Sequence, residues 1–160
     1  MSAKVDLNVG QKAPQFKLLD AGENSVSLGD FKGKWLVLYF YPKDDTSGCT
    51  LEAQDFTAQL PEFQKLNAAI VGVSPDSCQS HQKFIGKHSL KVQLLSDPEH
   101  SALESYGVWQ KKSMYGREYM GVVRTTYLID PQGVIRHIWP KVSVKGHADD
   151  VRETIAKLQS

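Results

Sequence analysis

Apolar residues along this chain occur as short uninterrupted runs and as helical repeats, separated by polar turns. Trp35–Tyr41 is apolar and aromatic throughout, without alternation, which is typical of a central strand covered on both faces. Ala69–Val73 is a second run of this kind. Shorter apolar segments predict three more strands, at Val92–Leu95, Thr125–Ile129 and Val134–Trp139.

Turn-forming residues between apolar segments predict two hairpins. Asp20–Asn24 separates Phe16–Leu19 from Val26–Leu28, so we expect a short hairpin near the N-terminus. Asp130–Gly133 separates the last two strands and combines Asp, Pro and Gly, which favours a tight turn. By contrast, Gln110–Met120 is polar and basic, and we expect a loop there.

Helical spacing of apolar residues follows the first central strand. One helix face is predicted by steps of four, three and four residues between Cys49, Ala53, Phe56 and Leu60. This helix is expected to continue past Pro61 toward Leu66. Further helices are predicted at about Ser77–Lys87, in a short stretch through Leu103, and at Val151–Leu158 behind Asp149 and Asp150.

Strands and helices alternate along the chain before a hairpin and a last helix. This order predicts the α/β class, with a central mixed β-sheet flanked by helices on both faces and an N-terminal β-hairpin. It matches a thioredoxin-like fold. A length of 160 residues suits one compact core, so we expect residues 1–160 to form a single domain.

Composition and charge exclude several classes of protein. The chain is 41% hydrophobic, which is too apolar for intrinsic disorder. Its net charge of +1 argues against a nucleic-acid binder, which needs a basic face. The apolar runs are too short to span a bilayer and Met1–Asp6 lacks the form of a signal peptide, so we expect a cytoplasmic protein without membrane contact. Two cysteines are too few for a disulfide framework.

Cys49 is the residue with the strongest signal for chemistry. It lies just past a predicted buried strand and within the first turn of the following helix. Unpaired backbone N–H groups and the helix dipole favour an anion there, and the thiolate is the nucleophilic form of cysteine. Gly48 lets the backbone approach closely, and Thr46 places a hydroxyl near the sulfur. The alternative is a small buried cysteine that only fills a contact between helix and sheet.

Pro42, Thr46 and Cys49 have the Pro-x-x-x-Thr-x-x-Cys spacing of the peroxiredoxins, and the surrounding run resembles the bacterioferritin comigratory protein branch, or Q type. The resemblance covers almost the whole chain. It is carried, in order, by Tyr39–Ala53, Gly72–Ser77, Ser80–Phe84, Leu95–Asp97, Met114–Gly116, Arg124–Asp130 and Val144–His147.

The resemblance implies a role for each residue around the cysteine. Cys49 would attack a hydroperoxide and become a sulfenic acid. Thr46 would hydrogen-bond the sulfur and the peroxide, and Pro42 would cover the thiolate. Arg124 would keep the sulfur ionised and stabilise charge as the O–O bond breaks, whereas without the resemblance it would be a solvated charge at a strand end. Glu52 would orient Arg124, or it is an ordinary acid stabilised by the helix dipole.

The second cysteine departs from the pattern of the relatives. Some carry a resolving cysteine five residues after the first, where this chain has Gln54, and others directly after Phe84, where it has Ile85. Cys78 is a candidate displaced resolving thiol, a packing residue, or half of a zinc site with His81, for which no second ligand pair is evident. His81 and His88 are otherwise expected to be solvated or capping.

The resulting hypothesis is a thiol-dependent peroxidase for hydrogen peroxide and small organic hydroperoxides. It would be reduced by thioredoxin or a similar dithiol carrier, without a metal, haem or flavin cofactor, and would be a monomer or a weak dimer. One alternative is a redox-sensing or chaperone-like binding protein that uses Cys49 as a switch. A disulfide oxidoreductase is the other, although the Cys-x-x-Cys pair is absent, with Thr46 at the place of the first cysteine. The basic segment Lys111–Arg117 is solvated surface or a contact for a partner.

Overall fold

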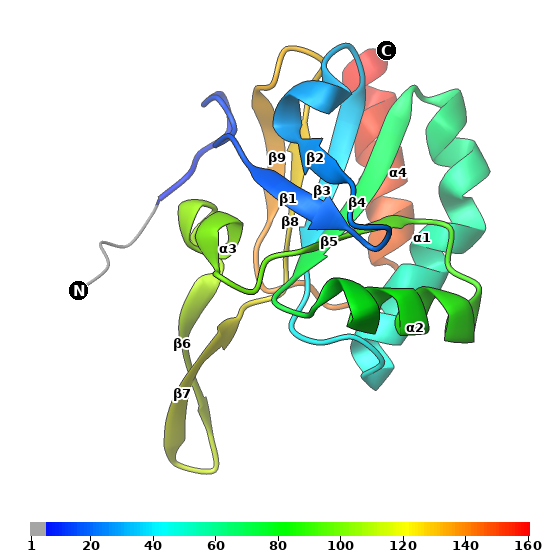
Figure 1. Ribbon diagram of the computed structural model, residues 1–160. Coiled ribbons are helices and arrows are strands. Elements are labelled where there is room, and N and C mark those ends of the chain that lie inside the picture. Colours follow the sequence, from blue (N-terminus) through cyan, green and yellow to red (C-terminus); the bar gives the residue numbers. More distant parts are fainter. Residues whose placement is uncertain (1–5) are drawn as a thin grey trace.

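A computed structural model describes residues 6–160 of the chain (Figure 1). In order, the elements are β1 (Lys17–Asp20), β2 (Ser25–Ser27), the 3-10 helix η1 (Leu28–Phe31), β3 (Trp35–Phe40), α1 (Ser47–Lys65), β4 (Ala68–Ser74), α2 (Cys78–His88), β5 (Gln93–Ser96), α3 (Ser101–Ser105), β6 (Trp109–Met114), β7 (Arg117–Val122), β8 (Thr125–Ile129), β9 (Ile135–Trp139) and α4 (His147–Gln159). None of the described helices combines the length and the apolar character needed to cross a membrane.

Seven strands form one mixed sheet in the order β2-β1-β5-β4-β3-β8-β9. Strands β3, β4 and β5 run parallel to one another, whereas β8 pairs antiparallel with β3, and β1 antiparallel with β5. The expected α/β class with a mixed sheet and an N-terminal hairpin is therefore confirmed, and Leu18 pairs with Val26 in that hairpin.

Strand β3 separates the two halves of the hydrophobic core. Leu36, Leu38 and Phe40 point to one side, because side chains alternate along a strand, while Val37 and Tyr39 point to the other. Helices α1, α2 and α4 cover the second side. Residues 7–16, η1 and α3 cover the first. Every residue of β3 is buried, as its apolar and aromatic sequence predicts.

The parallel pairing of β3 with β4 places two loops at one edge of the sheet. The loop after β3 leads into α1, and the loop after β4 leads into α2. Helix α1 begins at Ser47 and keeps Pro61 inside its length, as expected. Helix α4 begins at His147, so that Asp149 and Asp150 lie in its first turn rather than before it.

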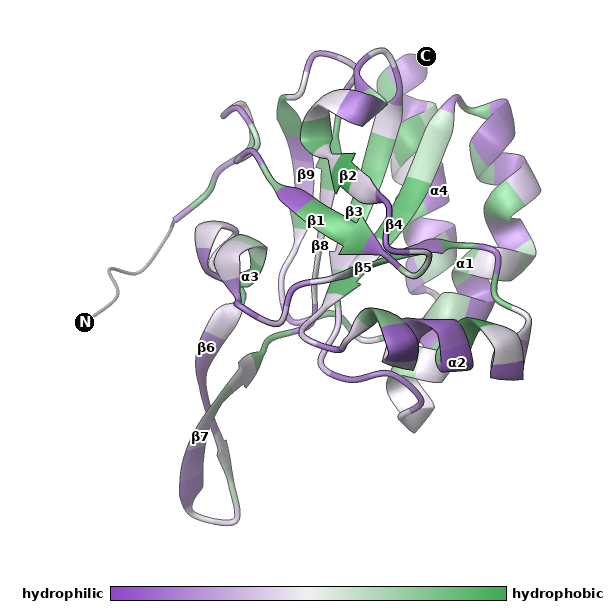
Figure 2. Cartoon of the chain, in the orientation of Figure 1, coloured by the Kyte–Doolittle hydropathy of each residue, from purple (hydrophilic) through white to green (hydrophobic). Residues whose placement is uncertain are grey.

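The expected loop at Gln110–Met120 is wrong, because this segment forms a hairpin. Strands β6 and β7 pair over their whole length and project from the body of the molecule (Figure 1). Tyr115 and Gly116 link them, both with positive φ, as a two-residue hairpin turn requires. Most side chains of the arm are exposed, so its sequence lacks the alternation that marks a half-buried strand, and β6 is mainly hydrophilic (Figure 2).

Candidate active site

Cys49 is the third residue of α1, at the edge of the sheet where β3 ends. Its side chain is buried, with 1% of the residue exposed. The first hydrogen bond of the helix runs from the Thr50 N–H to the Thr46 carbonyl, at 2.8 Å. The N–H groups that precede it have no partner within the helix, and together with the helix dipole they favour negative charge at this end.

Arg124 brings a full positive charge to the sulfur. It lies between β7 and β8, and its Nη2 is 3.1 Å from Sγ of Cys49. Only 17% of the Arg124 side chain is exposed, so water screens this contact weakly. Burial lowers the pKa of Arg124, but Glu52 and Cys49 raise it by more, and the guanidinium stays charged. Such a partner stabilises an anionic sulfur.

Glu52 binds the second terminal nitrogen of the Arg124 guanidinium. Its Oε1 accepts a hydrogen bond from Nη1 of Arg124 at 2.7 Å, while Oε2 has no hydrogen-bond partner among residues 6–160. Burial raises the pKa of Glu52 to about 7, although Arg124 pulls it in the opposite direction. The structure therefore brings Glu52 to Arg124, and not to the solvated face on which an ordinary helix acid would lie.

Gly48 leaves the space that Arg124 occupies. A Cβ atom built on Gly48 would lie 3.3 Å from Nη2 of Arg124, which is tighter than ordinary van der Waals contact. The sequence suggests only that the backbone can be approached here. The structure identifies the approaching group as the guanidinium.

Thr46 and Pro42 lie in the loop before α1. Thr46 is exposed, and its hydroxyl donates to the Lys43 carbonyl at 2.8 Å, so its one hydrogen is not directed at the sulfur. Its oxygen lone pairs can still accept a hydrogen bond from a ligand. Pro42 is half-buried and follows the buried Tyr41.

Cys78 lies in different surroundings. It is the first residue of α2, and both it and Cys49 are free thiols. It is buried, with 8% exposed, and it lines a groove together with Leu18 and Leu19 of β1, residues 96–99 and Ser101. None of Pro42, Thr46 and Arg124 lines that groove.

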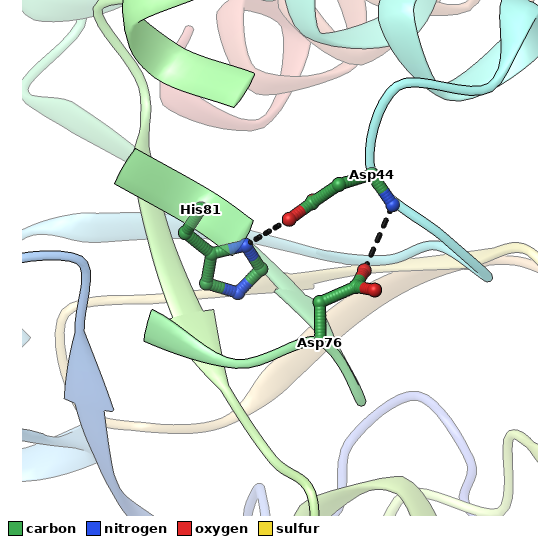
Figure 3. Close-up of side chains that lie close together, drawn as sticks. All are labelled: Asp44, Asp76 and His81. Atoms are coloured by element: carbon green, nitrogen blue, oxygen red, sulfur yellow. Dashed lines mark hydrogen bonds and ion pairs between the residues drawn. The ribbon is translucent and has the colours of Figure 1, made fainter. Parts of the chain in front are cut away.

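His81 is not solvated, contrary to expectation. His81 is fully buried, and its Nδ1 lies 2.7 Å from Oδ2 of Asp44 (Figure 3). Its Nε2 lies 2.9 Å from the Leu95 carbonyl. Both ring nitrogens are thus engaged away from Cys78, which contradicts a shared zinc site. A signal was present in the sequence, because His81 precedes the apolar Phe84 by three residues and so shares its helix face.

Comparison with known proteins agrees with this geometry. Residues 9–138 match the model of the AhpC/TSA family. The chain is 49% identical to "Putative peroxiredoxin bcp" of Helicobacter pylori over 149 residues, which cover 93% of this chain and 98% of that protein. It is 48% identical to "Peroxiredoxin Bcp" of Bacillus subtilis over 152 residues, covering 95% and 97% of the two chains.

Solved structures lead to the same group. A structure of the Xanthomonas campestris bacterioferritin comigratory protein superposes with a TM-score of 0.87 at 41% identity, covering 91% of this chain and 92% of that one. A cysteine-to-serine variant of Xylella fastidiosa PrxQ superposes with a TM-score of 0.93 at 34% identity, covering 98% and 99%. This protein belongs to the AhpC/TSA family, within its Bcp-type peroxiredoxins.

Proposed function

We propose that this peroxiredoxin, a thiol-dependent peroxidase, uses Cys49 to reduce hydrogen peroxide and small organic hydroperoxides. The observation that carries the assignment to Cys49 is the contact of 3.1 Å between its sulfur and the Arg124 guanidinium at a helix start. A buried sulfur with a cationic partner is suited to act as a thiolate nucleophile.

In the first step the Cys49 thiolate attacks the terminal oxygen of the hydroperoxide. An S–O bond forms as the O–O bond breaks, the sulfur is oxidised to a sulfenic acid, and the departing oxygen leaves as water or an alcohol after taking up a proton. Negative charge moves from sulfur to the leaving oxygen during this step. Arg124 offers its positive charge at that place before the reaction begins, and Glu52 keeps the guanidinium in position.

Thr46 and Pro42 would shape the entrance for the peroxide. The Thr46 hydroxyl donates to Lys43, which orients its lone pairs to accept the O–H of an incoming hydroperoxide. Pro42 would limit the access of water to the thiolate. An alkyl substrate is supported by the Xanthomonas campestris relative, whose structural study concerns alkyl peroxide reduction.

The sulfenic acid must then be reduced by a thiol, which the family implies. We propose thioredoxin or a similar dithiol carrier as the donor, acting on Cys49 directly, because Cys78 faces a groove that Pro42, Thr46 and Arg124 do not line. We further propose that residues 1–160 act as one domain, as a cytoplasmic monomer or weak dimer.

Replacement of the nucleophile tests the assignment. The wild-type protein should consume hydrogen peroxide over many turnovers with a thioredoxin system, followed by NADPH oxidation. Cys49→Ser should abolish turnover while the chain keeps Cys78 and its fold, which circular dichroism checks. Substantial turnover by the variant would refute the role of Cys49, and a single stoichiometric oxidation of the wild type would favour the redox-sensor alternative.

A further inference from the structure

The loop that leads into α1 and Cys49 is fastened to helix α2 through one buried carboxylate. Asp44 lies five residues before Cys49 and is 7% exposed. Its Oδ1 accepts from the Tyr41 hydroxyl at 2.6 Å, and its Oδ2 accepts from the Ser80 hydroxyl at 2.7 Å and faces Nδ1 of His81 at 2.7 Å. Its backbone N–H donates to Oδ2 of Asp76 at 2.8 Å. Both oxygens and the N–H of Asp44 are thus used to tie the loop to its surroundings.

His81 completes this arrangement because both of its ring nitrogens are engaged by acceptor groups or by the Asp44 carboxyl group. The Leu95 carbonyl can only accept, so Nε2 carries a hydrogen. The contact of Nδ1 with the Asp44 carboxyl group needs a second hydrogen between the two atoms. The pair therefore shares a hydrogen in a buried bond of 2.7 Å, which holds the loop to α2.

The cluster is complete without a cation. Ligand-type atoms of Asp44, Asp76 and His81 lie within 4.8 Å of one another, from the loop and from both sides of the start of α2 (Figure 3). However, Oδ2 of Asp76 accepts from the Asp44 N–H and from the Ser74 hydroxyl, and Nδ1 of His81 shares a hydrogen with Asp44. A metal ion would have to displace these internal bonds, so we treat the cluster as a hydrogen-bond network.

The network opposes a movement that the catalytic cycle requires. With 1% of the residue exposed, the sulfur of Cys49 is suited to meet a small peroxide but not the thiol of a protein reductant. A disulfide needs Cα atoms within about 7 Å of each other, so the start of α1 and the loop before it must open. Opening pulls this loop away from α2, where Ser80 and His81 hold Asp44.

We propose that Asp44 and His81 are positioning residues that hold Cys49 in its buried, Arg124-bound place and so set how the enzyme divides its time between peroxide attack and thiol reduction. This inference rests on the proposed function. It predicts that a weaker Asp44–His81 contact exposes Cys49 more often, which slows the peroxide step and favours the reductant.

The chain supplies a matched control at the next residue. Asp45 also joins the loop to α2, with Oδ2 2.8 Å from Nζ of Lys87 and Oδ1 2.8 Å from Nε2 of His88. Its side chain is 43% exposed, and exposed ion pairs stabilise little. Asp44→Asn and Asp45→Asn therefore make the same change in the same loop, once in a buried contact and once in an exposed one.

The first test measures access to the sulfur without any peroxide. In a Cys78→Ser background Cys49 is the only thiol, and its alkylation by iodoacetamide can be followed by mass spectrometry below the melting temperature of each variant. Asp44→Asn should speed alkylation about tenfold, since hydrogen bonds to charged groups are among the stronger ones, and Asp45→Asn should leave the rate within twofold. Ser80→Ala, which removes one donor to Asp44, should act in the same direction by about threefold.

The second test measures how the sulfenic acid is used. A second peroxide converts it to sulfinic acid only while Cys49 is still in the peroxide-binding place, so Asp44→Asn should lower the sulfinic fraction per turnover and the rate of peroxide attack. If Asp44 only supported the fold, Asp44→Asn would reduce the amount of folded protein. Peroxide attack and sulfinic acid formation would then fall equally, and the sulfinic fraction per turnover would not change.

Two results would overturn the inference: unchanged alkylation in Asp44→Asn, or equal acceleration in Asp44→Asn and Asp45→Asn. Neither depends on peroxidase activity, so a wild-type protein that fails to turn over peroxide would instead refute the proposed function.

Discussion

Cys49 and Cys78 have equivalent positions in the fold. Each lies in the first turn of a helix, each helix follows one of two neighbouring parallel strands, and both residues are buried. They differ in the partner of the sulfur, because Arg124 donates to the sulfur of Cys49, whereas Cys78 lines a groove of mixed polar and apolar residues that Arg124 does not line. A helix start alone therefore does not distinguish the nucleophile. The charged partner held by Glu52 does.

After replacement of Cys49 itself, the largest effect should come from removing that partner. Arg124→Gln removes both the positive charge and the guanidinium donor that lies 3.1 Å from the sulfur, so the rate constant of Cys49 with hydrogen peroxide should fall about 10²–10³-fold, the usual cost of removing a preorganised transition-state donor. Stopped-flow measurement of the single-turnover reaction checks this. In a Cys49→Ser background the same change should not alter the reaction of Cys78 with a thiol reagent.

Arg136→Gln is the matched control for this change. Arg136 also lies beside a buried carboxylate, Asp130, at 3.4 Å, but it belongs to β9 and contacts neither cysteine. We expect the peroxide rate of this variant to stay within twofold of the wild-type value. Equal losses in both arginine variants would mean that the effect arises from general destabilisation.

A smaller effect should follow from displacing Arg124 without removing it. Gly48→Ala introduces a Cβ atom 3.3 Å from Nη2 of Arg124. The guanidinium must then move by a few tenths of an ångström, which disturbs its contact with the sulfur. We expect the peroxide rate to fall about fivefold, equivalent to a weakened hydrogen bond of about 1 kcal/mol. The same stopped-flow assay measures it.

Gly86→Ala provides the comparison for the glycine variant. Gly86 lies inside α2, and a Cβ atom there would meet nothing within 4 Å. Alanine is the better helix former by about 1 kcal/mol, so this variant should melt at a higher temperature with an unchanged peroxide rate. If Gly48→Ala also keeps its peroxide rate, the position of Arg124 beside Cys49 is less critical than its charge.

The fold could be predicted for elements whose burial appears in the sequence as a pattern of apolar residues. Trp35–Phe40 is covered on both faces and its sequence is apolar throughout, so its place in the centre of the sheet could be predicted. The β6–β7 arm could not, because its side chains are mostly exposed and its pairing depends on a turn at Tyr115 and Gly116. The prediction of a single domain stays a prediction.

The site was predictable as a set of residues but not as a set of contacts. Its members were identified by resemblance, yet sequence distance hides that Arg124, 75 residues after Cys49, reaches the sulfur. His81 was misjudged because a polar residue near a helix start is usually solvated. Its burial depends on Asp44, which comes from another loop and shares no sequence pattern with it.

The smallest effect is expected at Cys78. It tests whether only Cys49 of the two cysteines takes part in the reaction. Because the groove of Cys78 is not lined by Pro42, Thr46 or Arg124, we expect Cys78→Ser to keep steady-state peroxide turnover with thioredoxin within about twofold, the change left by a mild buried substitution. Non-reducing peptide mapping of the wild type after one equivalent of peroxide should show no peptide linked through Cys49 and Cys78. A linked peptide together with lost turnover in Cys78→Ser would make Cys78 the resolving thiol. The start of α2 would then have to unwind together with that of α1, and the two cysteines would be partners in one cycle rather than a nucleophile and a packing residue.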